Sequence, residues 1–136
     1  MKLEYEILNK YHTVAIVGAS PNQERPSNIV VRYLRGHGYH VIPVNPQAPE
    51  VEGMTSYPDL LAIPEHVEVV DIFRSADDVI PIVDEALKIG ARVVWMQEGI
   101  INEEAATRAR EAGLLVVMDK CMRKQHIALM KKRRKQ

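Results

Sequence analysis

The sequence predicts an α/β fold in which helices cover both faces of a parallel sheet. Five short runs of mostly β-branched, apolar residues recur along the chain, and helix-like segments separate them. Each run is apolar almost throughout, which is typical of strands that are covered on both sides. We therefore expect a three-layer sandwich with a five-stranded parallel sheet in the order 3-2-1-4-5.

The predicted strands follow one another at regular intervals. Pro43 lies in the second strand and has no N–H to donate, so we expect it where that strand is ending rather than inside a central strand. The five runs are residues 13–18, 40–44, 67–73, 92–96 and 114–118.

Helix signals occupy the segments between the strands. Residues 27–38 are amphipathic and close on a glycine, a usual helix stop before a strand. Residues 77–90 place apolar side chains on one face. Pro81 near their start is tolerated if Asp77 or Asp78 caps the helix.

Two further helices complete the expected pattern. Residues 102–113 begin with Asn102 as a cap, continue with acidic residues in the first turn and present an alanine face. Residues 57–64 form a short helix at most, and the last helix is expected over about residues 122–130.

Length and composition indicate one domain over residues 1–136. The chain is 46% hydrophobic and 26% charged, which is ordinary for a globular protein. No apolar run approaches the ~18 residues of a membrane span, and the N-terminus carries acidic residues where a secretory signal would be apolar. With Cys121 as its single cysteine, the chain is expected to be cytoplasmic, with no membrane partner.

The charge is unevenly distributed although the formal net charge is zero. Five of the 18 basic residues lie within 131–136, which leaves residues 1–130 with a net charge of −5. We expect no nucleic-acid partner, because an acidic body offers no broad positive surface for the phosphate backbone. The basic tail, residues 131–136, is expected to be disordered, and contact with RNA or an anionic surface is the alternative.

The predicted topology places a ligand site at the carboxyl ends of the strands. We expect it where the winding reverses, between the first and fourth strands. The loops after those strands, residues 18–28 and 97–102, then face each other, with the exits of the second and third strands beside them.

The loop after the first strand favours phosphate binding. It has Gly18 but lacks the second and third glycines of the dinucleotide fingerprint. Pro26 or Ser27 can start a helix whose free N–H groups attract a phosphate, and Arg25 adds a cation. The alternative is a capped helix with a solvated arginine.

The residues that follow the second and third strands have either a ligand-binding or a structural role. A nicotinamide enzyme that prefers NAD needs an acidic residue after the second strand, where this chain has Asn45. Asn45 either contacts a base or ribose or holds a turn before Pro46. Phe73 and Arg74 either contact a ligand or form an ordinary strand end.

Catalytic and metal-binding patterns are scarce. The five histidines show no metal-ligand spacing, and no paired acid and base is visible, so no enzymatic activity is expected. Asp119 and His126 flank Cys121, which is therefore either a reactive thiolate or a structural cysteine. Gly99 is placed where the backbone can approach a ligand closely.

An ordered set of motifs over about residues 10–129 resembles the small stand-alone CoA-binding proteins. This Rossmann-like family is related to the N-terminal domain of the succinyl-CoA synthetase alpha subunit. The motifs are VAIVGASPNQERPSN, GYHVIPVNP, VEVVDIFR, GARVVWMQEGI, NEEAATRAREAGLLVV and DKCM. The resemblance implies that CoA lies across the carboxyl edge of the sheet.

The resemblance also assigns parts of the ligand to residues. It implies a phosphate corner, an adenosine side, contacts to the nucleotide and a pantetheine path. In that order the residues are Gly18, Ala19, Ser20, Pro21, Arg25, Ser27 and Asn28; Asn45 and Pro46; Phe73 and Arg74; and Met96, Gln97 and Gly99. Relatives often have a basic residue after the Asn-Pro pair, where this chain has Gln47.

Non-catalytic binding of CoA or an acyl-CoA is therefore the function that the sequence favours, in a monomer or a homodimer. A protein partner is possible, and the sequence does not identify one. One alternative is a nicotinamide-dependent oxidoreductase. The other is a redox protein in which Cys121 forms a mixed disulfide with the CoA thiol.

Overall fold

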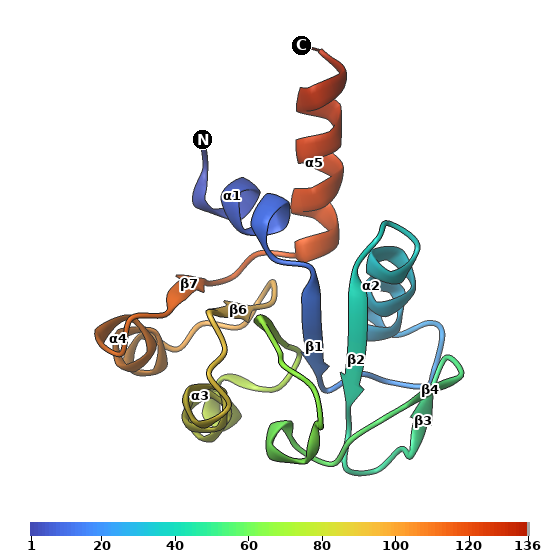
Figure 1. Ribbon diagram of the computed structural model, residues 1–136, viewed down its shortest axis with the longest axis vertical. Helices are drawn as coiled ribbons and strands as arrows, with labels where there is room; N and C mark the ends of the chain where they lie inside the picture. The colour runs from blue at the N-terminus through green and yellow to red at the C-terminus, as the bar shows by residue number, and fades with distance from the viewer. Residues whose placement is uncertain (136) are drawn as a thin grey trace.

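The computed structural model describes residues 1–135 and has the expected α/β architecture (Figure 1). Five parallel strands form one sheet in the order β2-β1-β5-β6-β7. The strands are β1 (Thr13–Val17), β2 (His40–Val44), β5 (Val69–Ile72), β6 (Val93–Met96) and β7 (Leu115–Val117). The prediction of a Rossmann-like fold with a five-stranded parallel sheet is confirmed.

Helices cover both faces of the sheet and make two separate apolar cores. One core joins Ile16 and Trp95 to the first, second and last helices, and the other joins Ala15 and Val94 to the two helices between them. Alternate residues of each strand therefore face opposite layers. The helices are α1 (Leu3–Lys10), α2 (Pro26–Arg35), α3 (Val79–Lys88), α4 (Glu103–Glu111) and α5 (Met122–Arg134).

The predicted strand order 3-2-1-4-5 is wrong, because the third predicted strand, β5, pairs with β1 instead of β2. Pro43 explains why. Its carbonyl points away from β1 and accepts from the Tyr57 N–H at 3.1 Å. A proline has no N–H on that outer side, so β2 suits the edge of the sheet, where an isolated bridge joins Val44 to Tyr57.

This order moves the point where the winding reverses. It lies between β1 and β5, and not between the first and fourth strands as the sequence predicted. The loops that begin at Gly18 and Phe73 therefore become direct neighbours.

A hairpin that the sequence analysis missed lies between β2 and β5. It consists of β3 (Glu50–Val51) and β4 (Met54–Thr55), joined by Glu52 and Gly53 with φ angles of 50° and 77°. A single turn of 3₁₀ helix, η1 (Leu60–Ala62), follows it, in agreement with a short helix at most over residues 57–64.

The helix starts follow the capping signals in two of three cases. Arg25 is the N-cap of α2, with Pro26 as its first helical residue. The Asn102 side chain accepts from the Ala105 N–H at 2.9 Å and caps α4. Asp78 ends a short 3₁₀ turn, η2 (Ala76–Asp78), and precedes α3 without a side-chain cap. Pro81 is tolerated because it lies in the first turn of α3, where no N–H is needed.

The chain ends differ most from expectation. The sequence analysis did not foresee α1, which packs against α5. Helix α5 continues over residues 131–134, where we expected a disordered tail, and projects beyond the sheet beside α1 (Figure 1). Basic side chains in a last helical turn favour the helix because they face its negative end, and the Lys132 amine lies 5.6 Å from the centre of the Tyr5 ring. Residue 136 of the expected tail lies outside the described residues.

Over residues 1–135, none of the helices has both the length and the apolar character needed to cross a membrane.

Candidate functional site

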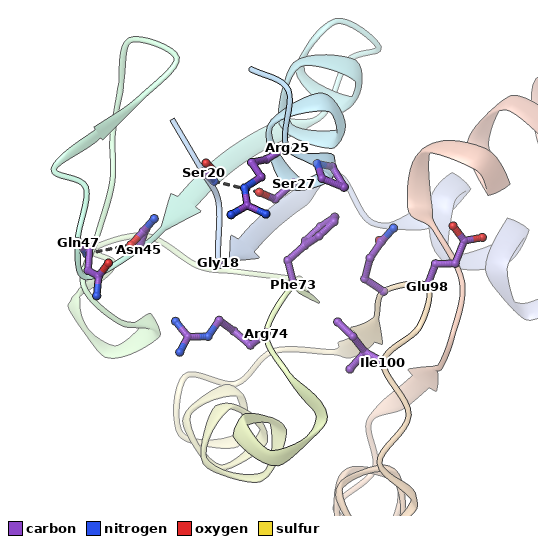
Figure 2. A pocket seen from close by; sticks show the side chains of 12 residues that line it. Gly18, Ser20, Arg25, Ser27, Asn45, Gln47, Phe73, Arg74, Glu98 and Ile100 are labelled. Carbon is purple, nitrogen blue, oxygen red and sulfur yellow. Dashed lines mark hydrogen bonds between the residues drawn. The ribbon is translucent and has the colours of Figure 1, made fainter. Parts of the chain in front are cut away.

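A cleft of about 670 Å³ opens at the carboxyl ends of β1, β5 and β6 (Figure 2). It lies at the point where the winding of the sheet reverses, which is where sheets of this type bind ligands. Its walls come from the loops after four strands and the start of α2. The lining residues are Gly18, Ser20, Arg25, Pro26, Ser27, Asn45, Gln47, Phe73, Arg74, Gln97, Glu98 and Ile100.

Gly18 and Phe73 form the closest approach in the floor of the cleft. Gly18 has a φ of +89°, and a Cβ atom built on it would lie 2.6 Å from the backbone oxygen of Phe73. Any other residue would therefore force β1 and β5 apart at this point. The Phe73 N–H donates to the Val17 carbonyl at 2.8 Å, which holds the two strand ends together.

Side chains of the loop after Gly18 fix its backbone. The Ser20 N–H donates to Ser27 Oγ at 3.0 Å, and the Asn22 N–H donates to Ser20 Oγ at 3.0 Å. The Glu24 N–H donates to Asn22 Oδ1 at 2.9 Å. The loop therefore has a defined shape without the glycines of a dinucleotide fingerprint.

The start of α2 provides positive charge at one wall. Within the described chain no side chain caps the N–H groups of its first turn, which leaves the positive end of the helix dipole open to an anion. Arg25 is exposed, and its guanidinium makes no ion pair among residues 1–135. Arg25 and Arg74 flank Gly18 in Figure 2.

Arg74 is the second cation of the cleft and is partly neutralised. Its Nη2 atom lies 3.3 Å from Asp78 Oδ2, and both side chains are nearly half exposed. Such an exposed pair is weak, because water competes for both partners. Arg74 can therefore turn toward an anionic ligand at little cost.

Both ends of the Asn45 side-chain amide are hydrogen-bonded to backbone groups. Its Nδ2 donates to the Ala19 carbonyl at 2.7 Å, and its Oδ1 accepts from the Gln47 N–H at 2.8 Å. The amide oxygen therefore holds the turn after β2 and the amide nitrogen ties that turn to the loop after β1, although the residue also lines the cleft.

The loop after β6 supplies a buried polar group. Gln97 is only 6% exposed, and its Oε1 atom has no hydrogen-bond partner in the described part of the chain. A buried acceptor without a partner is unfavourable, so a ligand N–H or O–H that reached it would be stabilising. Glu98 forms an exposed ion pair with Lys124 at 2.8 Å, which links the same loop to α5.

The structure brings together eight of the residues assigned by resemblance. Gly18, Ser20, Arg25, Ser27, Asn45, Phe73, Arg74 and Gln97 line the cleft. Ala19, Asn28 and Met96 are buried outside the lining, whereas Pro21, Pro46 and Gly99 are exposed outside it. The Gly99 N–H donates to Asp119 Oδ1 at 2.7 Å.

Four lining residues were not among those assigned. Pro26, Gln47, Glu98 and Ile100 each lie within two residues of an assigned position, so they belong to the same loops as the assigned residues. Position along a loop does not determine which side chains turn inward, and no pattern in the sequence supplies that information.

Cys121 is buried and outside the lining of the cleft. The groups considered as its partners are engaged elsewhere, because Asp119 accepts from Gly99 and His126 Nδ1 is hydrogen-bonded to the Tyr33 hydroxyl at 2.7 Å. Burial, with the nearby charges of His37 and Arg133, lowers the pKa of His126. This arrangement favours the structural reading of the cysteine.

Sequence reasoning missed Asp71, the most unusual polar residue of the sheet. It lies in β5 beside Ile16 and Trp95, is fully buried, and neither carboxyl oxygen has a partner within residues 1–135. Burial raises its pKa well above the usual value. An acidic residue in the middle of an apolar strand was the signal available.

No group of three or more His, Cys, Asp or Glu side chains in residues 1–135 is arranged to hold a metal ion.

Comparisons with known proteins identify relatives over most of the chain. A family profile described as the CoA binding domain matches residues 12–127. The uncharacterized protein YneT of Bacillus subtilis (strain 168) is 35% identical over 121 residues, which are 89% of this chain and 90% of YneT. The solved structure of a hypothetical protein from Pyrococcus horikoshii OT3 is 47% identical, with a TM-score of 0.91 over 93% of this chain and 89% of that one.

A larger enzyme contains a similar segment. An ADP-forming acetate–CoA ligase of Archaeoglobus fulgidus, designated I, is 28% identical over 119 residues. The match covers 80% of this chain but only 17% of the ligase. The similarity is therefore to one part of that enzyme.

Proposed function

Because this chain belongs to the CoA-binding domain family, we propose that it binds CoA or an acyl-CoA, without catalysing a reaction, in the cleft at the carboxyl ends of β1, β5 and β6. The observation that carries this proposal is the position of Arg25. Its guanidinium lies beside the open N-terminus of α2 and above the glycine floor, with no ion pair of its own among residues 1–135.

The charges of the cleft fit a pyrophosphate. Arg25 and the first turn of α2 supply donors at one wall, and Arg74 supplies a second cation across Gly18. Ser20 and Ser27 hold the loop between them through the 3.0 Å hydrogen bond. The pyrophosphate of CoA would therefore lie over Gly18.

The two ends of the cleft suit the two ends of CoA. Asn45 and Gln47 form the wall proposed for the adenosine half, with Phe73 beside it. Gln97 and Ile100 form the path proposed for pantetheine. The assigned residues outside the lining, among them Ala19 and Asn28, would act by supporting these walls.

The proposed role is that of a carrier, a sensor or a subunit that depends on a partner. We do not extend the activity of the acetate–CoA ligase to this chain, because the match covers 17% of that enzyme. An oxidoreductase that uses NAD is less favoured, because Asn45 offers no carboxylate and its amide is occupied by Ala19 and Gln47.

Calorimetric titration with CoA, acetyl-CoA and NADH tests the proposal. We expect CoA or acetyl-CoA to bind the wild type. Arg25→Ala should weaken that binding about tenfold to a hundredfold, the loss typical of one charge-assisted hydrogen bond. Arg110→Ala, on the exposed surface of α4, is the matched control and should bind like the wild type.

Two results would overturn this function. One is the absence of heat with millimolar CoA and acetyl-CoA. The other is selective binding of NADH, which would favour the oxidoreductase.

A further inference from the structure

We propose that Glu52, in the β3–β4 hairpin outside the cleft, is a positioning residue that holds the loop of residues 18–25 in its phosphate-binding shape. This inference rests on the proposed function and adds a residue that does not touch the ligand. It is carried by an unusual backbone conformation and by a set of hydrogen bonds that ends at Ser20.

The backbone of Glu52 is the first observation. Its φ of 50° lies in the left-handed region, and Gly53 follows with a φ of 77°. A two-residue hairpin turn of this kind favours Asn-Gly or Gly-Gly, and glutamate is a poor choice for its first position. A glutamate that is retained in such an unfavourable backbone conformation indicates that its side chain has a role.

The carboxylate of Glu52 contacts the first loop and α2. Asn28 Nδ2 donates to Glu52 Oε2 at 3.0 Å, and Gln23 Nε2 donates to the same carboxylate at 3.2 and 3.4 Å. These contacts join residues that are 24 and 29 positions apart in the chain. These hydrogen bonds also lower the pKa of Glu52.

The Asn28 side chain links Glu52 to Ser20 in the wall of the cleft. It is fully buried, and its Nδ2 also donates to the Ser20 carbonyl at 2.8 Å. Its Oδ1 accepts from Arg32 Nε at 2.7 Å, which fixes the orientation of the amide. Ser20 lines the cleft, so the hairpin and the phosphate loop are joined through one buried side chain.

A second connection holds the other end of the loop. Arg32 Nη2 donates to the Gln23 carbonyl at 2.9 Å, while the Gln23 side chain reaches Glu52. The hairpin itself is anchored to α2, because Arg35 Nη1 donates to the Glu52 carbonyl at 2.8 Å. The Glu52 side chain thus supports the loop at both Ser20 and Gln23.

Glu52→Asn separates the two roles of this position. Asparagine suits the left-handed turn better than glutamate does, but its side chain is one methylene shorter and does not reach Asn28 and Gln23. A residue with only a local role in the hairpin would gain stability and leave binding unchanged. A positioning residue would lose ligand affinity while the thermal midpoint stays the same or rises.

The test combines a CoA titration with amide hydrogen exchange on the wild type, Glu52→Asn and Glu50→Gln. We expect Glu52→Asn to bind CoA about three- to tenfold more weakly, the effect of one intramolecular hydrogen bond, and to exchange the Ser20 and Glu24 amides faster. The control Glu50→Gln changes an exposed glutamate of the same hairpin and should match the wild type.

The outcomes separate this inference from the proposed function. If the wild type binds CoA and Glu52→Asn binds it equally well, the role of Glu52 is overturned and the function stands. If the wild type binds no CoA, the function fails. Hydrogen exchange then decides the role of Glu52 in ordering the loop: faster exchange at Ser20 in Glu52→Asn supports it and unchanged exchange overturns it.

Discussion

A Cβ atom on Gly18 would lie 2.6 Å from the backbone oxygen of Phe73, so the floor of the cleft exists because residue 18 has no side chain. We expect Gly18→Ala to lower both the thermal midpoint and the affinity for CoA. Gly113→Ala is the matched control, because Gly113 has a similar φ of +92° but open space around it. The control should cost about 1 kcal/mol of backbone strain, and Gly18→Ala clearly more. Equal losses of stability in the two variants would contradict the steric argument.

The pair formed by Arg74 and Asp78 predicts a variant that binds CoA more tightly than the wild type. Asp78→Asn removes the carboxylate 3.3 Å from Arg74 and should leave that arginine freer to contact a phosphate. The expected gain in CoA affinity is up to about fivefold, as for an exposed ion pair of ~0.2–1 kcal/mol. Arg74→Ala should weaken binding instead. A calorimetric comparison in which both variants lose affinity would count against this role of Asp78.

Asp71 predicts a pH dependence of stability. Its pKa in the folded state is well above the usual value because the carboxyl group is buried. The unfolded chain releases this proton near pH ~4, so the free energy of unfolding should fall as pH rises from there toward the folded-state pKa, by about 1.4 kcal/mol per unit. Asp71→Asn does not ionise and should gain stability relative to the wild type over that range. If denaturation of the wild type and of Asp71→Asn gives free energies of unfolding that differ by the same amount at every pH from ~4 to ~7, the ionisation of Asp71 is excluded as the cause.

His126 predicts a dependence of the opposite sign. Its pKa is lowered by burial, by His37 and by Arg133. The unfolded chain takes up a proton first as pH falls, so this contribution is complete above pH ~6.5 and is lost as pH falls through the folded-state pKa. Relative to the wild type, His126→Asn should lose less stability between pH 7.5 and pH 5.5. Identical pH profiles of stability for His126→Asn and the wild type would refute the prediction.

The fold class could be predicted from local patterns, but the order of the strands could not. Each strand can be identified from its own short apolar run, whereas the strands with which it pairs are determined by contacts between residues far apart in the chain. Pro43 was placed correctly near the end of β2, yet its meaning as a marker of the sheet edge was missed. The β3–β4 hairpin was missed because its strands have two residues each and its turn is Glu-Gly.

The candidate site was predicted where it depends on strand ends and helix starts. Gly18, Arg25 and Phe73 directly follow or precede such boundaries, so their place at the cleft follows from the topology. Asn45 and Glu52 contact partners more than 20 residues away in sequence. Their roles depend on how the loops cross in space, and no spacing within the chain encodes that.

The cleft between the ends of β1 and β5 is the place where we propose that a CoA-type ligand binds. Titrating CoA into nitrogen-15-labelled protein and recording the amide resonances tests binding and location together. We expect saturable shifts at Gly18, Ser20 and Gln97, whereas the resonances of Gly90 and Gly113, which precede β6 and β7 at the amino ends of the strands, should stay unchanged. Resonances of Gly18 and Ser20 that stay in place at millimolar CoA would contradict this proposal.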